Sequence, residues 1–420
     1  MTDSLIACRD CGTIQGIRPP ARRTVVACRQ CGRVLENSNG RSLDAALACA
    51  IATFLLLLPT NMMALMTVRV AGIATSTHLG SGVAVAWRQG WPLIAIVLGL
   101  VGIVLPLLRF GLLSITLFAI RLGARGPRAG QAFRYCEALD QWAMSDVLLI
   151  GAGIGYGRIA SQISVHIDPG GWCLVGAAAM TMLTRATMER QAVWRCLETP
   201  AETSVPNALA CTSCDLVLPP EMAGRHCPRC RAVVHRRRPG SVQYCAALLI
   251  ATAILTPIAY GYPMSELWEL GRPEPHSVID GIQMLFQSGF WYFGVVITLV
   301  SLIFPLTKLA ALTWFLTSIW HRSGSRLRTK TRLYRFIDEV GRWSTLDPFT
   351  VLVFAPMAQF NQTAHIDFMG GSAAFLSTVV LSMLASHVLD ARLMWDAAEA
   401  GAQRRPSPYR VAPAAVQGVT

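Results

Sequence analysis

Charged residues are scarce in this sequence: Asp, Glu, Lys and Arg make up 15% of its 420 residues, whereas 53% are hydrophobic. An ordinary soluble domain has about 25% charged residues, so a water-soluble globule of this composition would have too little polar surface to cover itself. The composition, with a mean hydropathy of +0.44, therefore predicts an integral membrane protein.

Lysine is almost absent, since only Lys308 and Lys330 stand among the 37 basic residues. Neither lies in a G-x-x-x-x-G-K-[ST] motif, so no phosphate-binding loop is present to drive work from within the chain. An apolar signal-peptide core is also missing from residues 1–40, and we expect no cleaved leader. We do not expect an enzyme, and energy for any work must come from a partner or a gradient.

Eight apolar stretches are long enough to cross about 30 Å of hydrocarbon. They cover residues 44–66, 91–120, 143–160, 171–188, 242–262, 290–319, 345–362 and 371–389. An even number of spans puts both termini on one side, and that side then carries 31 of the 37 Lys and Arg residues. By the positive-inside rule this side is cytoplasmic. The distribution of basic residues is thus explained by the orientation of the chain in the membrane. We therefore do not expect nucleic acid as a partner.

The sequence contains an internal repeat with a period of about 200 residues. The landmarks that recur in order are Gly82 as Gly281, Gly90 as Gly289, Pro106 as Pro305, Arg109 as Lys308, Trp142 as Trp343 and Asp146 as Asp347. Each half holds four predicted helices, so the halves run in the same direction, as in parallel-repeat transporters. The predicted membrane repeats are residues 41–200 and 239–398, and residues 399–420 form a cytoplasmic tail.

Each membrane repeat is preceded by two C-x-x-C knuckles, in residues 1–40 and 201–238. The eight cysteines are Cys8, Cys11, Cys28, Cys31, Cys211, Cys214, Cys227 and Cys230. Two knuckles at this separation can bring four thiolates to one tetrahedral ion, and the cytoplasm keeps thiols reduced. The spacing therefore predicts two cytoplasmic zinc ribbons with one structural Zn ion each. A rubredoxin-like iron site and a metal-free fold are the alternatives.

Polar residues inside the apolar stretches are predicted to form ion pairs. Arg109 lies about 27 Å along its helix, at 1.5 Å per residue, which matches the depth of Asp146. Because an isolated charge inside the membrane costs at least a few kcal/mol, we predict the pairs Arg109–Asp146 and Lys308–Asp347. The alternative is that the basic side chains extend to the interface. A proline one turn before each basic residue is expected to bend the helix.

The sequence also predicts the positions of three further residues and the secondary structure of four connecting segments. Asn61 lies near the outer end of the first helix, as a helix cap or as part of a polar path. Trp142 and Trp343 are expected to anchor their helices at the membrane interface. Few helix signals and many Thr, Val, Ile and Ser residues predict short periplasmic strands within residues 67–77, 161–167, 264–280 and 362–368.

Together these features resemble the paraquat-inducible protein A family of inner-membrane proteins. The resemblance covers nearly the whole chain and rests on two four-cysteine ribbons, each followed by four helices. It also rests on short motifs: Pro-x-Asn at 59–61, Leu-Pro-Leu at 105–107, Phe-Pro-Leu at 304–306 and Arg-Trp-Ser at 342–344. The chain departs from the family at Tyr260, which replaces Asn, at Ala64, which replaces Pro, and at Asp215 and Arg231, which replace glycine.

The resemblance implies an all-α integral membrane protein of the bacterial inner membrane, with eight helices in two parallel four-helix repeats. It also implies a role beside an MCE-domain protein that bridges the periplasm and moves phospholipids between the inner and outer membranes. The alternatives are a small-molecule or ion transporter, a quinone-linked redox protein with iron at the cysteines, and a scaffold for the MCE partner.

Overall fold

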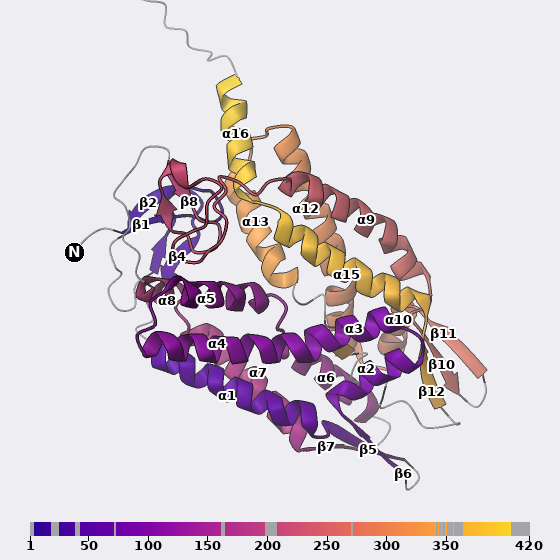
Figure 1. Cartoon of the computed structure of the whole chain (residues 1–420). Coiled ribbons are helices and arrows are strands. Elements are labelled where there is room, and N and C mark those ends of the chain that lie inside the picture. Colours follow the sequence, from indigo (N-terminus) through magenta and orange to yellow (C-terminus); the bar gives the residue numbers. More distant parts are fainter. Residues whose placement is uncertain are drawn as a thin grey trace, which may run out of the picture.

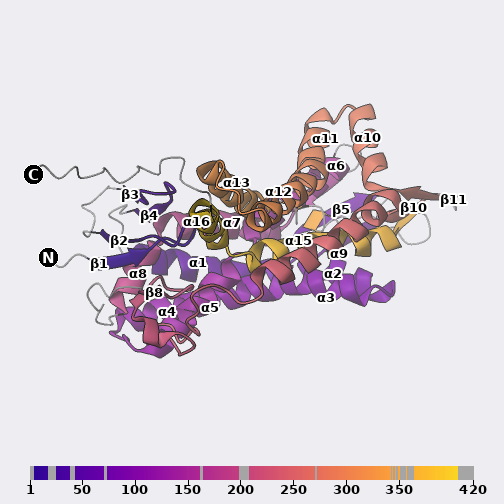
Figure 2. The ribbon, with the colours of Figure 1, turned by 90° about the horizontal axis from the view of Figure 1, so that it is seen from above.

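The computed structural model describes residues 4–17, 25–37, 43–70, 73–160, 164–197, 208–269, 272–341 and 364–404, together with residues 343, 346, 349, 350 and 356. These residues are mostly helical (Figure 1). The two four-cysteine segments lie at one end of an elongated molecule, and two small sheets lie at the opposite end (Figures 1 and 2). Long helices connect the two ends.

The first helical unit begins with α1 (Leu43–Met62) and contains one long helix assembled from three segments. These segments are α3 (Pro92–Gly99), the π-helical η1 (Leu100–Val104) and α4 (Leu105–Arg121). The remaining elements are β5 (Met66–Val70), β6 (Ile73–Thr77), α2 (Leu79–Arg88), α5 (Pro127–Asp140), α6 (Ser145–Ala160), β7 (Ser164–Ile167), α7 (Pro169–Thr187) and α8 (Arg190–Cys196).

The second helical unit repeats this order of elements, as the duplicated sequence predicts. Its elements are α9 (Ser241–Gly261), β10 (Ser265–Glu269), β11 (Arg272–His276), α10 (Val278–Gln287), α11 (Trp291–Ile297), η3 (Thr298–Ile303), α12 (Phe304–Trp320), α13 (Leu327–Val340), β12 (Ala364–Phe368), α15 (Gly370–Val388) and α16 (Arg392–Arg404). The predicted span 345–362, the counterpart of α6, lies almost wholly outside the described residues.

Five helices in the described part of the chain are long and apolar enough to cross a membrane. They are α1, the helix Pro92–Arg121, α9, the helix Trp291–Trp320 and α15. These match five of the eight predicted spans. The predicted spans 143–160 and 171–188 are also helical, but α6 has only 16 residues and the 19-residue α7 is less apolar.

Each long helix contains a π-helical segment directly before its proline. Five residues of η1 precede Leu105-Pro106, and six residues of η3 precede Phe304-Pro305. Proline has no backbone N–H to donate to the preceding turn, and π turns are a common way for a helix to accommodate such an interruption. The sequence predicts a bend at these prolines, and the structure has a π turn there.

The strands expected between the helices are present in both units. The sheet orders are β6-β5-β7 and β11-β10-β12, and every pairing is antiparallel. The first unit also forms hydrogen bonds with the second unit's sheet. The Gln89 side chain donates to the Ile366 carbonyl at 2.8 Å and accepts from the Phe368 N–H at 2.9 Å. The largest hydrophobic core lies between the two units and contains buried side chains from both, such as Leu98 and Phe375.

Candidate metal centres and buried polar groups

The first four-cysteine segment is built from two hairpins, each with one C-x-x-C knuckle. The strands are β1 (Ser4–Ala7) with β2 (Ile14–Ile17), and β3 (Val25–Ala27) with β4 (Val34–Asn37). Its four sulfurs converge, since Cys8 Sγ lies 3.5 Å from Cys31 Sγ and Cys11 Sγ lies 3.6 Å from Cys28 Sγ. All four thiols are buried.

The second segment has the same arrangement of knuckles, but its strands are shorter. It contains β8 (Leu209–Ala210) and β9 (Val217–Leu218), and all four thiols are again buried. The Sγ atoms of Cys211 and Cys230 are 3.5 Å apart, and those of Cys214 and Cys227 are 3.6 Å apart. We refer to the two segments as ribbon 1 and ribbon 2.

Each ribbon has the geometry of a four-thiolate metal site. In both clusters all four sulfurs lie within 4.8 Å of one another. A tetrahedral Zn²⁺ with bonds of about 2.3 Å requires sulfurs about 3.8 Å apart, so the clusters fit this ion closely. Hydrogen bonding among the thiols lowers the pKa of Cys11 and raises the pKa of Cys31. Each cluster can therefore hold a metal ion.

Ribbon 1 packs against the second helical unit, although it precedes the first unit in the sequence. Trp395 of α16 belongs to the same buried cluster as the four cysteines. Arg335 of α13 donates to the Cys31 carbonyl at 2.8 Å and lies 2.9 Å from the Asp10 carboxylate. Arg392 of α16 donates to the Arg9 carbonyl at 3.1 Å.

Ribbon 2 packs against the first helical unit, so the two ribbons are crossed. Its cysteines share a buried cluster with Trp194 of α8 and Phe133 of α5, whose rings meet edge to face at 5.0 Å. Arg229 donates to the Trp194 carbonyl at 3.4 Å. A Cβ at Gly130 of α5 would lie 1.9 Å from the Arg229 carbonyl oxygen, so only glycine permits this approach.

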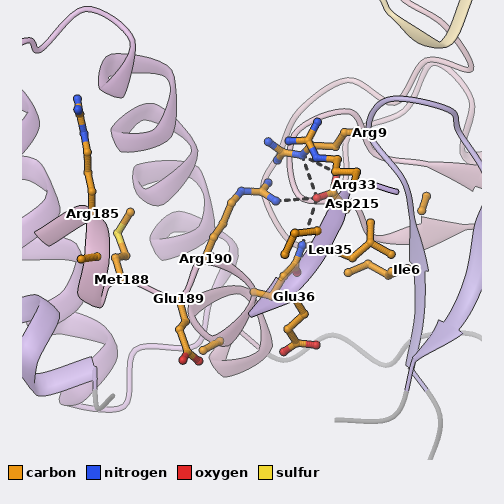
Figure 3. Close-up of a pocket in the computed structure, with 15 residues that line it drawn as sticks. Ile6, Arg9, Arg33, Leu35, Glu36, Arg185, Met188, Glu189, Arg190 and Asp215 are labelled. Carbon is orange, nitrogen blue, oxygen red and sulfur yellow. Dashed lines mark hydrogen bonds and ion pairs between the residues drawn. The ribbon is translucent and has the colours of Figure 1, made fainter. Parts of the chain in front are cut away.

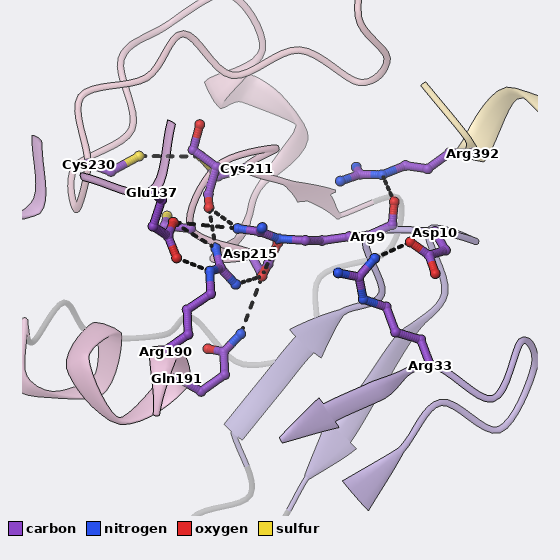
Figure 4. A network of polar contacts seen from close by, with 12 residues as sticks. Arg9, Asp10, Arg33, Glu137, Arg190, Gln191, Cys211, Asp215, Cys230 and Arg392 are labelled. Carbon is purple, nitrogen blue, oxygen red and sulfur yellow. Dashed lines mark hydrogen bonds and ion pairs between the residues drawn. The ribbon is translucent and has the colours of Figure 1, made fainter. Parts of the chain in front are cut away.

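A polar network joins the two ribbons to each other and to α5 and α8 (Figure 4). Asp215 of ribbon 2 accepts from Arg9 of ribbon 1 at 2.9 Å and from Arg190 of α8 at 2.6 Å. Arg190 also pairs with Glu137 of α5. Burial raises the pKa of Glu137 to about 8, and the charge of Arg9 opposes this shift. An isolated β-bridge between Ile6 and Leu216 completes the contact.

The network borders a cavity of about 390 Å³ between ribbon 1, α8 and the end of α7. In Figure 3 the Arg9 and Arg190 side chains converge on Asp215, whereas Arg185 points away from them. The lining contains four arginines and three acidic residues. Because these charges largely cancel, the cavity is not a strong anion site.

Arg109 lies in a group of four charged residues rather than in a simple pair. Its side chain is 1% exposed and forms an ion pair with Asp140, the last residue of α5. Arg185 of α7 connects Asp140, at 3.4 Å, to Asp146 of α6, at 2.7 Å. The predicted partner Asp146 therefore belongs to the same group, but the direct partner of Arg109 is Asp140. The connecting helix α5 supplies it because its end lies at the depth of Arg109.

Lys308 occupies the corresponding place in the second unit. It is 3% exposed, and the acid that acts on it electrostatically is Asp338 of the connecting helix α13. A Cβ at Gly341 would lie 2.9 Å from Lys308 Nζ, so the glycine makes room for the ammonium group. The predicted partner Asp347 lies outside the described residues, so the Lys308–Asp347 pair stays a prediction.

The other sequence-selected residues lie apart from these groups. Asn61 lies in the last turn of α1, where its amide donates to the Leu57 carbonyl at 2.7 Å. Its Oδ1 is buried without a hydrogen-bond partner among the described residues. Trp142 and Trp343 are half-buried and both pack against the core between the units.

Sequence reasoning did not select Asp140, Arg185 and Asp338. Each lies outside or at the end of an apolar stretch, where charged residues are ordinary, so the sequence carries no local signal for its role. The available signal was the pairing rule itself: a buried base needs an acid at equal depth, and the connecting helices hold several acids.

A family model matches most of the chain. The model of the family described as "Paraquat-inducible protein A" matches residues 43–198 and 242–399, which are the two helical units. The chain belongs to this family. The expected family membership is thus confirmed.

Curated members of the family are similar over most of their length. "Lipophilic envelope-spanning tunnel protein A" of Escherichia coli is 30% identical over 287 residues, which are 66% of each chain. "Intermembrane transport protein PqiA" of the same organism is 24% identical over 364 residues, 83% of this chain and 85% of its own. "Probable intermembrane transport protein" of Haemophilus influenzae is 22% identical over 360 residues, 82% of this chain and 84% of its own. These names describe transport proteins rather than enzymes. No solved structure matches the chain.

Proposed function

We propose that this chain is the inner-membrane component of an MCE-type intermembrane phospholipid transport system. It loads lipid onto, or receives lipid from, an MCE-domain partner that spans the periplasm. The observation that carries the proposal is family membership over both helical units, together with relatives named as intermembrane transport proteins.

The proposed topology has eight membrane helices in two parallel repeats, with both termini and both ribbons in the cytoplasm. Support comes from the five candidate spans, from the matched order of elements in the two units, and from the 31 basic residues that this topology places on one side. The ribbons and the sheets lie at opposite ends of the molecule, so this topology places the sheets in the periplasm (Figure 1).

The proposed cofactors are two Zn ions, one in each ribbon. The sulfur spacing suits Zn²⁺, and four thiolates leave no open coordination position for a substrate. A structural role follows, in which the ion supplies folding free energy to segments that have little apolar core of their own.

The proposed lipid path runs beside the buried polar groups of the two units, with Arg109, Asp146, Lys308, Asp347 and Asn61 as its polar residues. A phospholipid carries a charged headgroup, and an apolar membrane interior opposes its passage. Buried basic groups at corresponding positions of the two units offer partners for a phosphate.

Replacement of Lys308 tests the proposal. Lys308→Ala removes a buried charge from the path, and Thr313→Ala is the matched control, because Thr313 is exposed on the same helix and its hydroxyl donates to the Leu309 carbonyl of that helix. We expect Lys308→Ala to abolish rescue of outer-membrane integrity in cells that lack the native protein, at unchanged protein level and partner co-purification. The control should rescue fully.

Three results would contradict the proposal. Full rescue by Lys308→Ala with the partner still bound would indicate a scaffold. Uptake of a soluble substrate that depends on Lys308, without phospholipid in the purified protein, would indicate a small-molecule transporter. A visible absorbance that bleaches on reduction would indicate iron in the ribbons and a redox role.

A further inference from the structure

A second cavity, distinct from the ribbon network, lies where two candidate membrane helices end together. It has a volume of about 560 Å³ and lies between the start of α1, the end of α4 and helix α8. These elements come together at the ribbon end of the molecule in both overall views (Figures 1 and 2). Since α1 begins and α4 ends at the limits of their apolar spans, the proposed topology puts the cavity at the membrane edge.

One side of this cavity is apolar. Leu47 of α1 and Leu117 and Ile120 of α4 line it, and each is less than 9% exposed. These side chains form the apolar floor of the cavity and also pack into the buried core beneath it.

The other side of the cavity is basic. Among the described residues, Arg121, Arg125 and Arg195 line it together with one acid, Asp44. Arg121 pairs with Asp44 at 3.1 Å, but both side chains are more than half exposed, and such pairs contribute little. A guanidinium has five N–H donors, so Arg121 retains donors for a further anion. Arg195 pairs with the Glu36 carboxylate of ribbon 1, which orients it.

The three arginines that line the cavity are not repeated at the corresponding positions of the second unit. At the repeat offset, Arg121 and Arg125 correspond to Trp320 and Gly324, and Arg195 corresponds to Asp396. The positive-inside rule asks for basic residues on this side of the membrane but not for their collection around one cavity. The second unit carries basic residues at other positions of the same connection, at Arg322 and Arg326, so the arrangement of arginines around this cavity is specific to the first unit.

We propose that this cavity binds an anionic phospholipid of the cytoplasmic leaflet. Arg121, Arg125 and Arg195 hold the phosphate and the upper acyl chain lies on the floor of Leu47, Leu117 and Ile120, as basic pockets at the cytoplasmic side hold anionic headgroups. The proposal rests on the proposed function for the membrane orientation, and it adds a lipid class and a second site away from Lys308.

Lipid retention in a matched pair of variants tests the site. The double variant R121Q/R125Q removes two charges from the cavity, and R128Q/R322Q removes two exposed charges from the same end of the molecule without touching the cavity. Both proteins are reconstituted in nanodiscs of phosphatidylcholine with phosphatidylglycerol and extracted into detergent. Native mass spectrometry then counts the retained phosphatidylglycerol.

We expect R121Q/R125Q to retain phosphatidylglycerol roughly tenfold less than the unmodified chain, since two basic contacts to an anionic headgroup are lost. R128Q/R322Q should retain it fully. Equal loss in both variants, or in neither, would overturn the proposal. So would a delipidated protein that inorganic phosphate stabilises against heat through Arg121 and Arg125 while phosphatidylglycerol is not retained, because that identifies free phosphate as the ligand. Retention needs neither transport nor a partner, so this test and the Lys308 test can fail separately.

Discussion

At the scale of single residues, the two ribbons differ in how they accommodate the turn after each knuckle. In ribbon 1 the residues that follow are Gly12 and Gly32, with φ of +79° and +69°. In ribbon 2 they are Asp215 and Arg231, with φ of +59° and +57°. A side chain in this left-handed region costs about 1 kcal/mol or more, so ribbon 2 stores backbone strain that ribbon 1 avoids.

Two glycine substitutions separate this strain from the polar network. Arg231 is exposed, so Arg231→Gly should only relieve the strain and stabilise ribbon 2 by about 1 kcal/mol. Asp215→Gly relieves the same strain but removes the acceptor of Arg9 and Arg190, and we expect a net loss of stability. The rate at which a chelator extracts metal from the full chain measures both effects. Slower extraction from both variants would mean that the ion pairs of Asp215 contribute nothing.

At the scale of elements, the packing of α15 against the end of α9 depends on one glycine. The Gly371 N–H donates to the Pro263 carbonyl at 3.1 Å, and an added Cβ would lie 2.5 Å from that oxygen. The same contact recurs in the first unit, where a Cβ at Gly170 would lie 2.5 Å from the Ala64 carbonyl oxygen. The Gly-Gly pairs of the duplicated sequence therefore mark a close approach between two backbones.

Alanine at the two adjacent glycines gives opposite expectations. Gly371→Ala forces the helix ends apart and should destabilise the chain by about 1–3 kcal/mol. At Gly370 an added Cβ meets nothing within 4 Å, so Gly370→Ala should be neutral or slightly stabilising. Thermal unfolding in detergent micelles checks both. A similar loss of stability in both variants would show that α15 tolerates no alanine here for reasons other than the carbonyl contact.

At the scale of the whole molecule, sequence reasoning succeeded where the information is local or duplicated. The knuckle spacing predicted both cysteine clusters, the repeat predicted the matched order of elements, and the Thr, Val, Ile and Ser residues of the connecting segments predicted the short strands. It did not predict Asp140 as the partner of Arg109, because that choice depends on where α5 lies against α4. It predicted eight spans, and the glycine-rich α6 and the threonine-containing α7 do not reach the length or hydropathy of the other five.

The crossed packing of the ribbons was also beyond sequence reasoning, because the buried cysteine cluster of each ribbon packs on the unit that does not directly follow it. Nothing in the linear order identifies Trp395 as the residue beneath ribbon 1 or Trp194 as the residue beneath ribbon 2, although the repeat pairs the two tryptophans. The arrangement links the two membrane units at the ribbon end, as Gln89 links them at the sheet end.

Metal loss from ribbon 1 should therefore loosen the second helical unit, and metal loss from ribbon 2 should loosen the first. In neither case should the unit that directly follows the ribbon in the sequence be affected most. In the full chain, C28S/C31S removes two ligands of ribbon 1, and we expect faster hydrogen–deuterium exchange in α13 and α16 than in α5 and α8. The reciprocal variant C227S/C230S is the matched control and should favour exchange in α5 and α8, because its ribbon packs there.

Each ribbon contacts the other through Asp215, so smaller changes should spread to the second pair of helices. If the first variant instead loosened mainly α1, which directly follows ribbon 1, the crossed contacts would carry no stability, and the ribbons would act only on their own units.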